Sequence, residues 1–218
     1  LEDVSFYASE DADIAFQLTK ILIVKLEEEN LSEPYNNIEV PLIPVLTMIE
    51  KNGVNLDLDF LANLSIQFGS RLTELSEKIH QLAGEEFNIN SPKQLGEILF
   101  DKLELKPVRK RSTAVEVLKT LKNHHPLPEE VLKYRHLAKL KSTYVDAFPN
   151  YVNKETGRVH TSLNQTIAAT GRLSSTSPNF QNIPIRTETG RELRKAFIPQ
   201  KKDWVILSAD YSQVELRI

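Results

Sequence analysis

Two acidic residues near the C-terminal end are candidates to bind a metal ion. Asp210 follows the apolar run Trp204–Ala209, and Glu215 comes shortly after it. We expect the run to form a buried strand, which would hold the Asp210 carboxylate rigidly at the edge of a cleft. An isolated Asp before a helix more often caps backbone N–H groups. Phosphoryl transfer assisted by two metal ions needs at least two acids, so residues outside this chain must complete such a mechanism.

A polar segment further upstream could bind another molecule. Arg172 follows Gly171, and further hydrogen-bonding side chains come after it: Asn179, Gln181, Asn182 and Arg186. The small residues at 174–177 leave room for a ligand to approach. Amide and guanidinium groups suit the acceptors of the DNA minor groove and phosphates. The same residue types are also typical of an ordinary loop.

Basic residues are concentrated in the second half of the chain. Residues 1–92 carry 5 Lys+Arg and 17 Asp+Glu, residues 93–158 carry 14 and 8, and residues 159–218 carry 8 and 5. Two groups of these residues lie in the predicted helical arm. Four are at its tip, before the expected helix 114–122, and four are on the last long helix: Lys106, Arg109, Lys110 and Arg111, and Lys133, Arg135, Lys139 and Lys141. Such a surface attracts phosphates whatever the base sequence. The alternative is a solvated helix face without a ligand.

The composition limits the class of protein. The chain has 218 residues, 40% hydrophobic content and no cysteine, which excludes a disordered chain, a disulfide framework and a thiolate metal site. No apolar run approaches about 18 residues, and the acidic start is unlike a signal peptide. We therefore expect a soluble, intracellular protein without membrane contact. An end just after Glu215, at the start of a helix, suggests a piece of a longer protein.

Hydrophobic periodicity predicts a mainly helical structure up to about residue 150. The expected helices cover residues 9–29, 41–52, 57–83, 91–103, 114–122 and 128–147. Asp57, Ser91 and Ser112 are expected N-caps, and Gly84 is an expected helix end. Residues 34–37 are expected to form a linker.

Beyond residue 150 the pattern changes to short strands. The strand-like segments are 151–152, 159–167, 195–198 and 204–209, with a turn at Gly157–Arg158. The expected fold class is therefore α+β, mainly α, with a helical arm joined to a few antiparallel strands.

Several motifs resemble family A DNA polymerases, closest to the bacterial DNA polymerase I group. They are Thr170–Ser175, Gln181–Pro184 and Ser208–Ile218, which are similar to the entry of the palm and its motif A, and Tyr134–Tyr144, which is similar to the thumb. The resemblance covers essentially the whole chain. It implies three parts: residues 1–36 as the end of a 3′-5′ exonuclease-like domain, 37–150 as the thumb and its base, and 151–218 as the first part of the palm.

The resemblance also implies roles for individual residues. Asp210, with the Tyr211 backbone carbonyl, would bind two catalytic Mg²⁺ ions, and Glu215 would select deoxynucleotides by excluding a ribose 2′-hydroxyl. Arg172 would contact the minor-groove edge at the primer terminus. The other DNA-binding residues would be Lys139, Arg135, Lys141, Asn179, Gln181, Asn182, Arg186 and Gln213.

The N-terminal segment resembles part of a proofreading site. Asp11 is similar to an exonuclease metal ligand, and Tyr7 to the residue that orients the attacking water. The i to i+4 spacing places both on one helix face. An ordinary acidic helix start is the alternative.

The resemblance thus predicts a fragment of a monomeric DNA-directed DNA polymerase acting in replication and repair in the bacterial cytoplasm, at the nucleoid. Its partners would be primer-template DNA and, in the complete enzyme, deoxynucleoside triphosphates, and the fragment alone would bind DNA without extending it. Two rival functions are a non-catalytic DNA-binding module, indifferent to Asp210→Ala, and an exonuclease-only protein, which would depend on Asp11 and not on Arg172.

Overall fold

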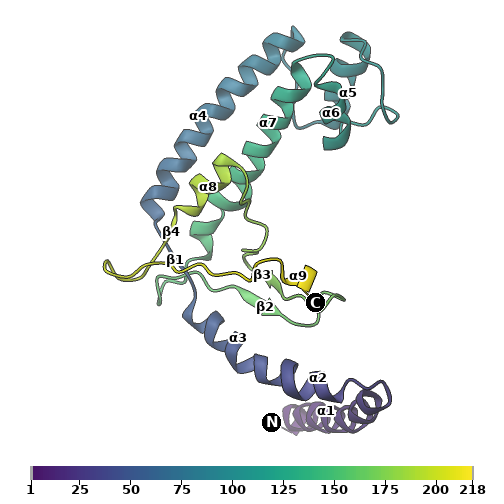
Figure 1. The fold of residues 1–218 in the computed structure, drawn as a ribbon, viewed down its shortest axis with the longest axis vertical. Coiled ribbons are helices and arrows are strands. Elements are labelled where there is room, and N and C mark those ends of the chain that lie inside the picture. Colours follow the sequence, from purple (N-terminus) through teal and green to yellow (C-terminus); the bar gives the residue numbers. More distant parts are fainter. Residues whose placement is uncertain (1, 218) are drawn as a thin grey trace. The chain divides into compact units, whose positions relative to one another are not determined.

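The chain forms two compact units in the computed structural model, which describes residues 2–217 except the side chains of Glu2, Asp3 and Glu215. The first unit comprises residues 1–52 and 162–174, and the second comprises residues 53–161 and 175–218. Most of the chain is helical, and the strands are short (Figure 1). The expected class, α+β and mainly α, is confirmed.

The first unit contains two helical runs and one strand. Its elements are α1 (Glu2–Glu28), α2 (Ser32–Pro34), the π-helical turn η1 (Tyr35–Glu39), α3 (Val40–Asn52) and β2 (Ser162–Asn164). α1 confirms the first expected helix but begins earlier. Its apolar side chains are about half exposed, for example Leu18 at 49% and Leu22 at 52%.

The linker expected at residues 34–37 is wrong, because the chain is helical there. α2, η1 and α3 follow one another without a break. Pro34 lies in the first turn, where its missing N–H has no helical acceptor to reach. Pro41 was expected in the first turn of a helix, but it lies inside the continuous helical run, as the second residue of α3. The π-helical turn η1 ends just before α3. Its wider turn accommodates the loss of the hydrogen bond that the proline cannot donate.

The second unit is built around two long helices, α4 and α7. Its elements are β1 (Asn55–Leu56), α4 (Leu58–Ala83), α5 (Pro92–Glu97), η2 (Ile98–Lys102), α6 (Val115–Leu121), α7 (Leu127–Leu140), η3 (Lys141–Val145), η4 (Phe148–Tyr151), α8 (Glu188–Arg194), β4 (Phe197–Ile198) and α9 (Val214–Arg217). β3 (Ser174–Thr176) spans the boundary between the units and pairs with β2. α4 and α7 lie side by side (Figure 1).

The ends of α4 are those that the sequence predicts. The Asp57 carboxylate accepts a hydrogen bond from the Phe60 N–H at 2.8 Å, which satisfies a backbone donor of the first turn. Gly84 ends the helix with φ +72°, a left-handed conformation that glycine adopts at little cost. Ser91 likewise caps α5. The expected cap at Ser112 is wrong, because Ala114 occupies the N-cap of α6 and the Ser112 hydroxyl accepts from its N–H instead.

Two hydrophobic clusters hold α4 and α7 together along their length. At the start of α4, Leu61 and Phe68 pack with Leu140 of α7 in one cluster. At its end, Ile79 packs with Val131 in the other. All of these side chains are 3% exposed or less. Burial on this scale stabilises the helix pair far more than helix propensity does.

Short strands join the later part of the chain to this unit. β1 and β4 are antiparallel, with Asn55 opposite Ile198 and Leu56 opposite Phe197. Phe197 also packs edge-to-face against Phe148 and Phe180, which places the segment after β3 close to the base of α7. The expected strand at 195–198 is thus confirmed in part.

The strand expected at residues 204–209 is wrong. No described strand pairs with this segment, and its apolar side chains are exposed, with Val205 at 86% and Leu207 at 88%. A strand obtains its backbone hydrogen bonds from a neighbouring strand, which the described part of the chain does not provide here. The apolar pattern alone therefore does not produce a buried strand.

Candidate nucleic-acid interface and metal-binding acid

The polar segment after β3 is a tightly held loop. Ser175 is 1% exposed, and its hydroxyl accepts a hydrogen bond from the Phe180 N–H at 3.1 Å. The Thr161 hydroxyl lies 2.7 Å from it. The small size of Ser175 predicted that it would leave room for a ligand. This prediction is wrong for Ser175, because its side chain is buried. It fills the inside of the loop and fixes the backbone around it.

The amide side chains of this loop differ in what they contact. Asn179 accepts a hydrogen bond from the Gln181 N–H at 2.9 Å, and Gln181 accepts one from the Ser175 N–H at 3.3 Å. Asn182 is exposed, while its backbone carbonyl accepts from the Tyr144 hydroxyl at 2.7 Å. The loop thus fixes its backbone through internal contacts and presents Asn182 to solvent.

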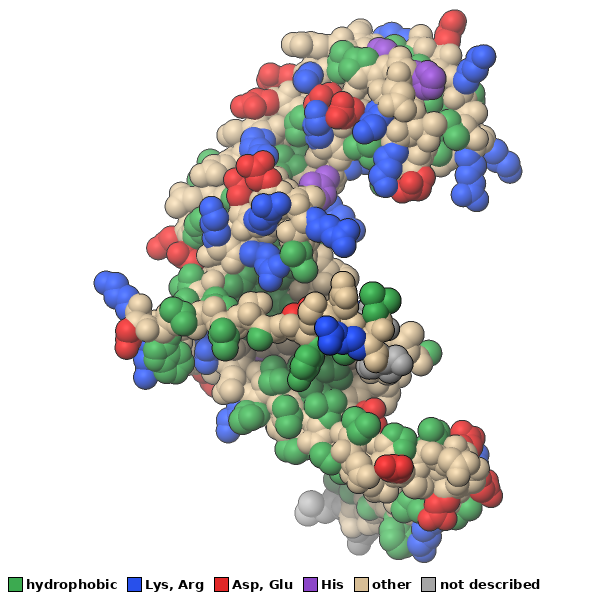
Figure 2. Space-filling model, in the orientation of Figure 1, with side chains coloured by type: hydrophobic (Ala, Val, Ile, Leu, Met, Phe, Trp, Pro, Cys, Tyr) green, Lys and Arg blue, Asp and Glu red, His purple; other side chains and the backbone are tan. Residues whose placement is uncertain are grey.

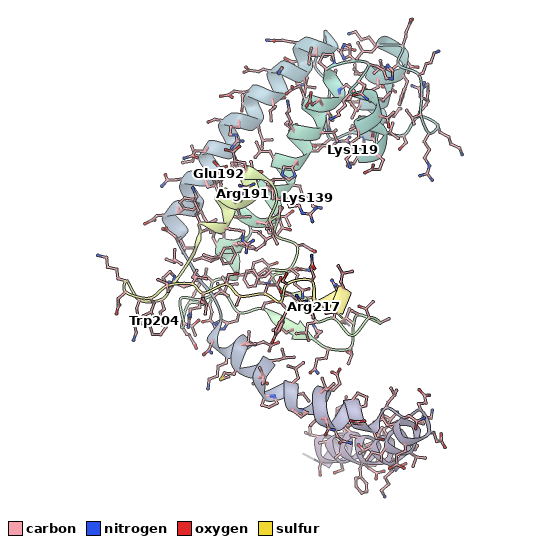
Figure 3. All side chains as sticks on the ribbon, viewed as in Figure 1. Lys119, Lys139, Arg191, Glu192, Trp204 and Arg217 are labelled. Atoms are coloured by element: carbon pink, nitrogen blue, oxygen red, sulfur yellow. The ribbon has the colours of Figure 1, made fainter. Side chains whose placement is uncertain are left out.

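Arg186 and Arg191 follow the loop, and Arg191 lies on α8, which packs against α7. Arg186 is exposed, and its carbonyl accepts a hydrogen bond from the Arg191 guanidinium at 3.3 Å. α8 is anchored to α7 by a contact of 3.2 Å between the His136 ring and the Thr189 hydroxyl. Arg191 is accordingly near Lys139, as Figure 3 shows. Sequence reasoning missed Arg191; the available signal was its place in the last turn of a short capped helix.

The basic residues expected on α7 fall into two groups. Lys139 is exposed, and none of the ion pairs among residues 2–217 involves it. Lys141 instead pairs with Asp146 at 2.8 Å. Arg135 donates to the Thr113 carbonyl at 2.7 Å, and burial lowers the pKa of its guanidinium. Lys and Arg side chains gather where α7 and α8 meet (Figure 2).

The link before α6 is held by an ion pair. Arg111 donates two hydrogen bonds to Asp101, one of them at 2.7 Å, and this contact lowers the pKa of the Asp101 carboxyl. Arg109 and Lys110 are exposed in the same link. The basic link is therefore partly neutralised at Arg111.

Asp210 lies in an exposed, extended segment. Tyr211 after it is 84% exposed, and Gln213 is also exposed with φ +54°. The Glu215 side chain is outside the described residues. Nowhere in residues 2–217, within the described side chains, do three or more His, Cys, Asp or Glu gather to hold a metal ion. The donors present, one carboxylate and one backbone carbonyl, are the oxygen ligands that suit Mg²⁺, which commonly completes its shell with water and substrate phosphates.

Three other expected site residues, Arg172, Tyr7 and Asp11, belong to the first unit. Arg172 is exposed after Gly171, whose φ of +73° marks a tight turn. Tyr7 and Asp11 are both exposed on α1, one helical turn apart. Arg172 and Asp210 are in different units, and each is described within its own unit.

Comparison with known proteins identifies the family. The model of DNA polymerase family A matches residues 58–218. DNA polymerase I of Pseudomonas aeruginosa is 47% identical over 225 residues, which cover 100% of this chain and 24% of that protein. This chain belongs to DNA polymerase family A.

Further relatives within family A agree. DNA polymerase I of Deinococcus radiodurans is 53% identical over 84% of this chain and 20% of its own length. A solved structure titled as the POL domain of Pol1 from M. smegmatis, in complex with DNA primer-template and dNTP, matches with a TM-score of 0.78 and 39% identity, covering 84% of this chain and 33% of that chain. The family A chain described here thus spans about a quarter of the length of the curated relatives that it matches.

The comparisons confirm the family resemblance and the polymerase fold class. In the part of the chain that the structure describes, no helix is long and apolar enough to cross a membrane.

Proposed function

We propose that this chain acts as part of a DNA-directed DNA polymerase that extends a primer on a DNA template in replication and repair. The observation that carries the proposal is the held loop at 177–182, which presents Asn182 to solvent and whose Asn182 carbonyl is bonded to Tyr144, shortly after the helix that carries the exposed Lys139. Polar side chains for base edges and cations for phosphates are the two contact types that duplex DNA requires. The solved relative bound to primer-template and dNTP supports the same partners.

In this proposal the loop and the helices have different tasks. Asn179, Gln181 and Asn182, together with Arg172, Arg186 and Gln213, contact the minor groove, where acceptors recur at every base pair. Lys139 binds the phosphate backbone. Arg135 and Lys141 contribute by holding the arm in place, because their charged groups are engaged with Thr113 and Asp146.

Asp210 and the Tyr211 carbonyl would hold Mg²⁺ in the proposed active site. Two bound Mg²⁺ ions would stabilise the attacking and leaving oxygens of the nucleotidyl transfer. Glu215 would exclude the ribose 2′-hydroxyl and so select deoxynucleoside triphosphates. The described residues supply one carboxylate at this position, so we expect the 218-residue chain alone to bind DNA without extending it.

The proposed division follows the family pattern. Residues 1–36 end a 3′-5′ exonuclease-like domain in which Asp11 and Tyr7 belong to the metal site, 37–150 form the thumb and its base, and 151–218 begin the palm. The protein would act as a monomer on DNA in the bacterial cytoplasm, at the nucleoid.

Duplex binding by this chain tests the DNA interface. Fluorescence anisotropy with a labelled primer-template, measured over a range of salt concentrations, gives the number of phosphate contacts from the slope. Lys139→Ala should reduce that slope by about 1. Lys154→Ala, an exposed lysine in the hairpin turn, is the matched control and should leave it unchanged. Equal slopes for Lys139→Ala and the unmodified chain would contradict the proposed role.

Primer extension tests the catalytic role in the polymerase that contains this chain. Asp210→Ala should abolish extension while DNA affinity changes by less than about twofold, because this residue would act through the metal ions. Arg172→Ala should slow extension much more than it weakens binding. Full extension by Asp210→Ala would leave a non-catalytic DNA-binding module as the better description, whereas nuclease activity that needs Asp11 and not Arg172 would favour an exonuclease.

A further inference from the structure

A chain of hydroxyl groups closes the inside of the polar loop. The Phe180 N–H donates to the Ser175 hydroxyl at 3.1 Å, and this hydroxyl lies 2.7 Å from that of Thr161. The Thr161 hydroxyl is in turn 2.8 Å from the Pro178 carbonyl. The Thr161 hydroxyl also lies 3.0 Å from the Thr176 carbonyl, and the Ser175 hydroxyl lies 3.1 Å from the Pro178 carbonyl. Each hydroxyl can accept one hydrogen bond and donate one, so this network satisfies both. The order Phe180, Ser175, Thr161, Pro178 is one arrangement in which the bonds reinforce one another.

The loop is also anchored from outside by aromatic residues. The Tyr144 hydroxyl donates to the Asn182 carbonyl at 2.7 Å. The Phe180 ring packs edge-to-face against Phe148 and Phe197, with centroids 5.6 and 5.7 Å apart. Tyr144 and Phe148 belong to a cluster of buried side chains, so the loop is tied to the hydrophobic core of this unit.

Many contacts hold the loop after β3, although it has no regular secondary structure. Ordering each residue of a loop costs backbone entropy, so a polar loop of this length would sample many conformations without such contacts. Ser175 and Thr161 place their hydroxyls inward, with Ser175 at 1% exposure, and they present nothing to a ligand. Asn182, by contrast, is exposed at the end of the same loop.

We propose that the Thr161–Ser175 hydroxyl pair is a positioning device that fixes the loop at 177–182 in the conformation in which Asn179 and Asn182 read the DNA minor groove. Neither hydroxyl touches DNA, and both act through the loop backbone. The inference rests on the proposed DNA interface. Its physical basis is that the entropy of ordering the loop is lost on folding rather than on binding, which leaves more of the contact energy for affinity.

Matched substitutions at Thr161 separate positioning from general stability. Thr161→Val keeps the shape and removes the hydroxyl, and Thr161→Ser keeps the hydroxyl. Each variant of the 218-residue chain would be titrated with two primer-template duplexes, one natural and one in which a 3-deazapurine near the primer terminus lacks the minor-groove N3 acceptor. Urea unfolding of each variant checks that it is folded.

We expect Thr161→Val to bind the natural duplex about tenfold more weakly, since one well-placed hydrogen bond contributes on that order. Its affinity for the 3-deazapurine duplex should barely change, so the preference between the duplexes should disappear. The salt slope should stay the same, because the phosphate contacts remain. Thr161→Ser should keep the preference of the unmodified chain.

A double substitution shows whether Thr161→Val weakens duplex binding by displacing Asn182. In the background of Asn182→Ala, which removes the exposed reader, Thr161→Val should change affinity by less than about twofold, because the two residues act on one contact. Tyr144→Phe removes a second anchor while the ring stays packed, and it should behave like Thr161→Val. This variant replaces Thr161→Val if the latter fails to fold.

The outcomes separate a failure of the positioning role from a failure of the proposed DNA interface. If the unmodified chain prefers the natural duplex and both Thr161→Val and Tyr144→Phe keep that preference, the positioning role is wrong although the interface stands. If their affinity falls equally for both duplexes, the hydroxyl pair serves stability only, and the inference is again overturned. If the unmodified chain shows no preference and no duplex binding, the proposed interface itself fails.

Discussion

The helical arm and the C-terminal segment of the second unit show two outcomes for apolar sequence patterns. On α4, Leu61 and Phe68 are fully buried, and α7 supplies the facing side chains. In the C-terminal segment, Val205 and Leu207 are 86% and 88% exposed, although the segment is as apolar as any stretch in the arm. The comparison teaches that an apolar pattern becomes a buried element only where the described chain provides its partner.

The physical reason lies in where backbone hydrogen bonds are made. A helix satisfies its own N–H and C=O groups, so α4 needs only an apolar face and two good ends. A strand needs a neighbour for the same groups. The segment carrying Asp210 has no such neighbour in the described residues, so it forms no strand and Asp210 is exposed. The arm forms regular helices because each helix makes its own backbone hydrogen bonds.

Hydrogen exchange should give the largest contrast between the two regions. Amides of α4 around Phe68 should exchange only through global unfolding, whereas those of residues 205–209 should exchange at nearly the unprotected rate. We expect at least about a thousandfold difference in rate, which mass spectrometry of peptic fragments or NMR would measure. Similar protection in both regions would mean that the C-terminal segment is paired.

Truncating an apolar side chain should lower the free energy of unfolding much more in the arm than in the C-terminal segment. Phe68→Ala removes a fully buried ring from the cluster at the base of the arm, and it should lower the free energy of unfolding by about 3–5 kcal/mol. Leu207→Ala is the matched change in the exposed segment and should stay within about 0.5 kcal/mol. Urea unfolding followed by circular dichroism measures both. A loss of several kcal/mol for Leu207→Ala would contradict its exposure.

A buried carboxylate in the arm should make its stability depend on pH. Glu130 is 5% exposed and accepts hydrogen bonds from Lys78 at 3.0 Å and Lys133 at 3.1 Å. Burial by itself would raise the pKa of Glu130, but the two lysines outweigh it and hold the pKa below its usual value. Glu130→Gln should cost about 1.5 kcal/mol near neutral pH, since both lysines are half exposed.

The sign of the pH effect follows from that lowered pKa. The stabilisation by the Glu130 carboxylate is complete above its unfolded-state pKa of about 4.3 and is lost as the pH falls through the lower folded-state pKa. Urea unfolding of the unmodified chain and of Glu130→Gln at pH 7 and pH 3 should therefore show a gap that narrows in acid. A gap that widens in acid would show that burial dominates this pKa.

The smallest of these effects concerns the start of α4. Asp57→Ala removes the side chain that accepts the Phe60 N–H and should cost about 1 kcal/mol in urea unfolding. Asp57→Asn keeps the acceptor and should restore most of the stability. Asp59→Ala, in the same turn, is exposed and should cost only about 0.3 kcal/mol through the helix dipole. Equal losses for Asp57→Ala and Asp59→Ala would exclude a specific cap.

Sequence reasoning succeeded where the signals were local. Asp57 and Gly84 predicted both ends of α4, and Ser91 with Pro92 predicted the start of α5. It failed at Pro34, where a proline in a first turn looked like a linker. A proline is compatible with both a linker and the first turn of a helix. The neighbouring helical turns determine which of the two structures forms at Pro34.

The candidate site was predictable as a set of residues and not as a set of contacts. Asn182 and Lys139 are exposed, as an interface requires. Lys141 has the same residue type and comes only two positions later, yet it pairs with Asp146 and donates to Ser65. Ser175 had the composition of an open loop and is buried. Arg191 was missed because only the packing of α8 on α7 brings it near Lys139.

The sequence by itself determined the family, the presence of the long helices and both ends of α4, because motifs, helical periodicity and capping residues act over a few neighbouring positions. Only the tertiary structure decided which polar groups are engaged. Whether a lysine meets a carboxylate or a serine meets a threonine depends on segments far apart in the chain, such as Lys141 with Ser65 and Ser175 with Thr161. Packing against the base of the arm brings these segments together, and that same packing leaves Asn182 and Lys139 exposed.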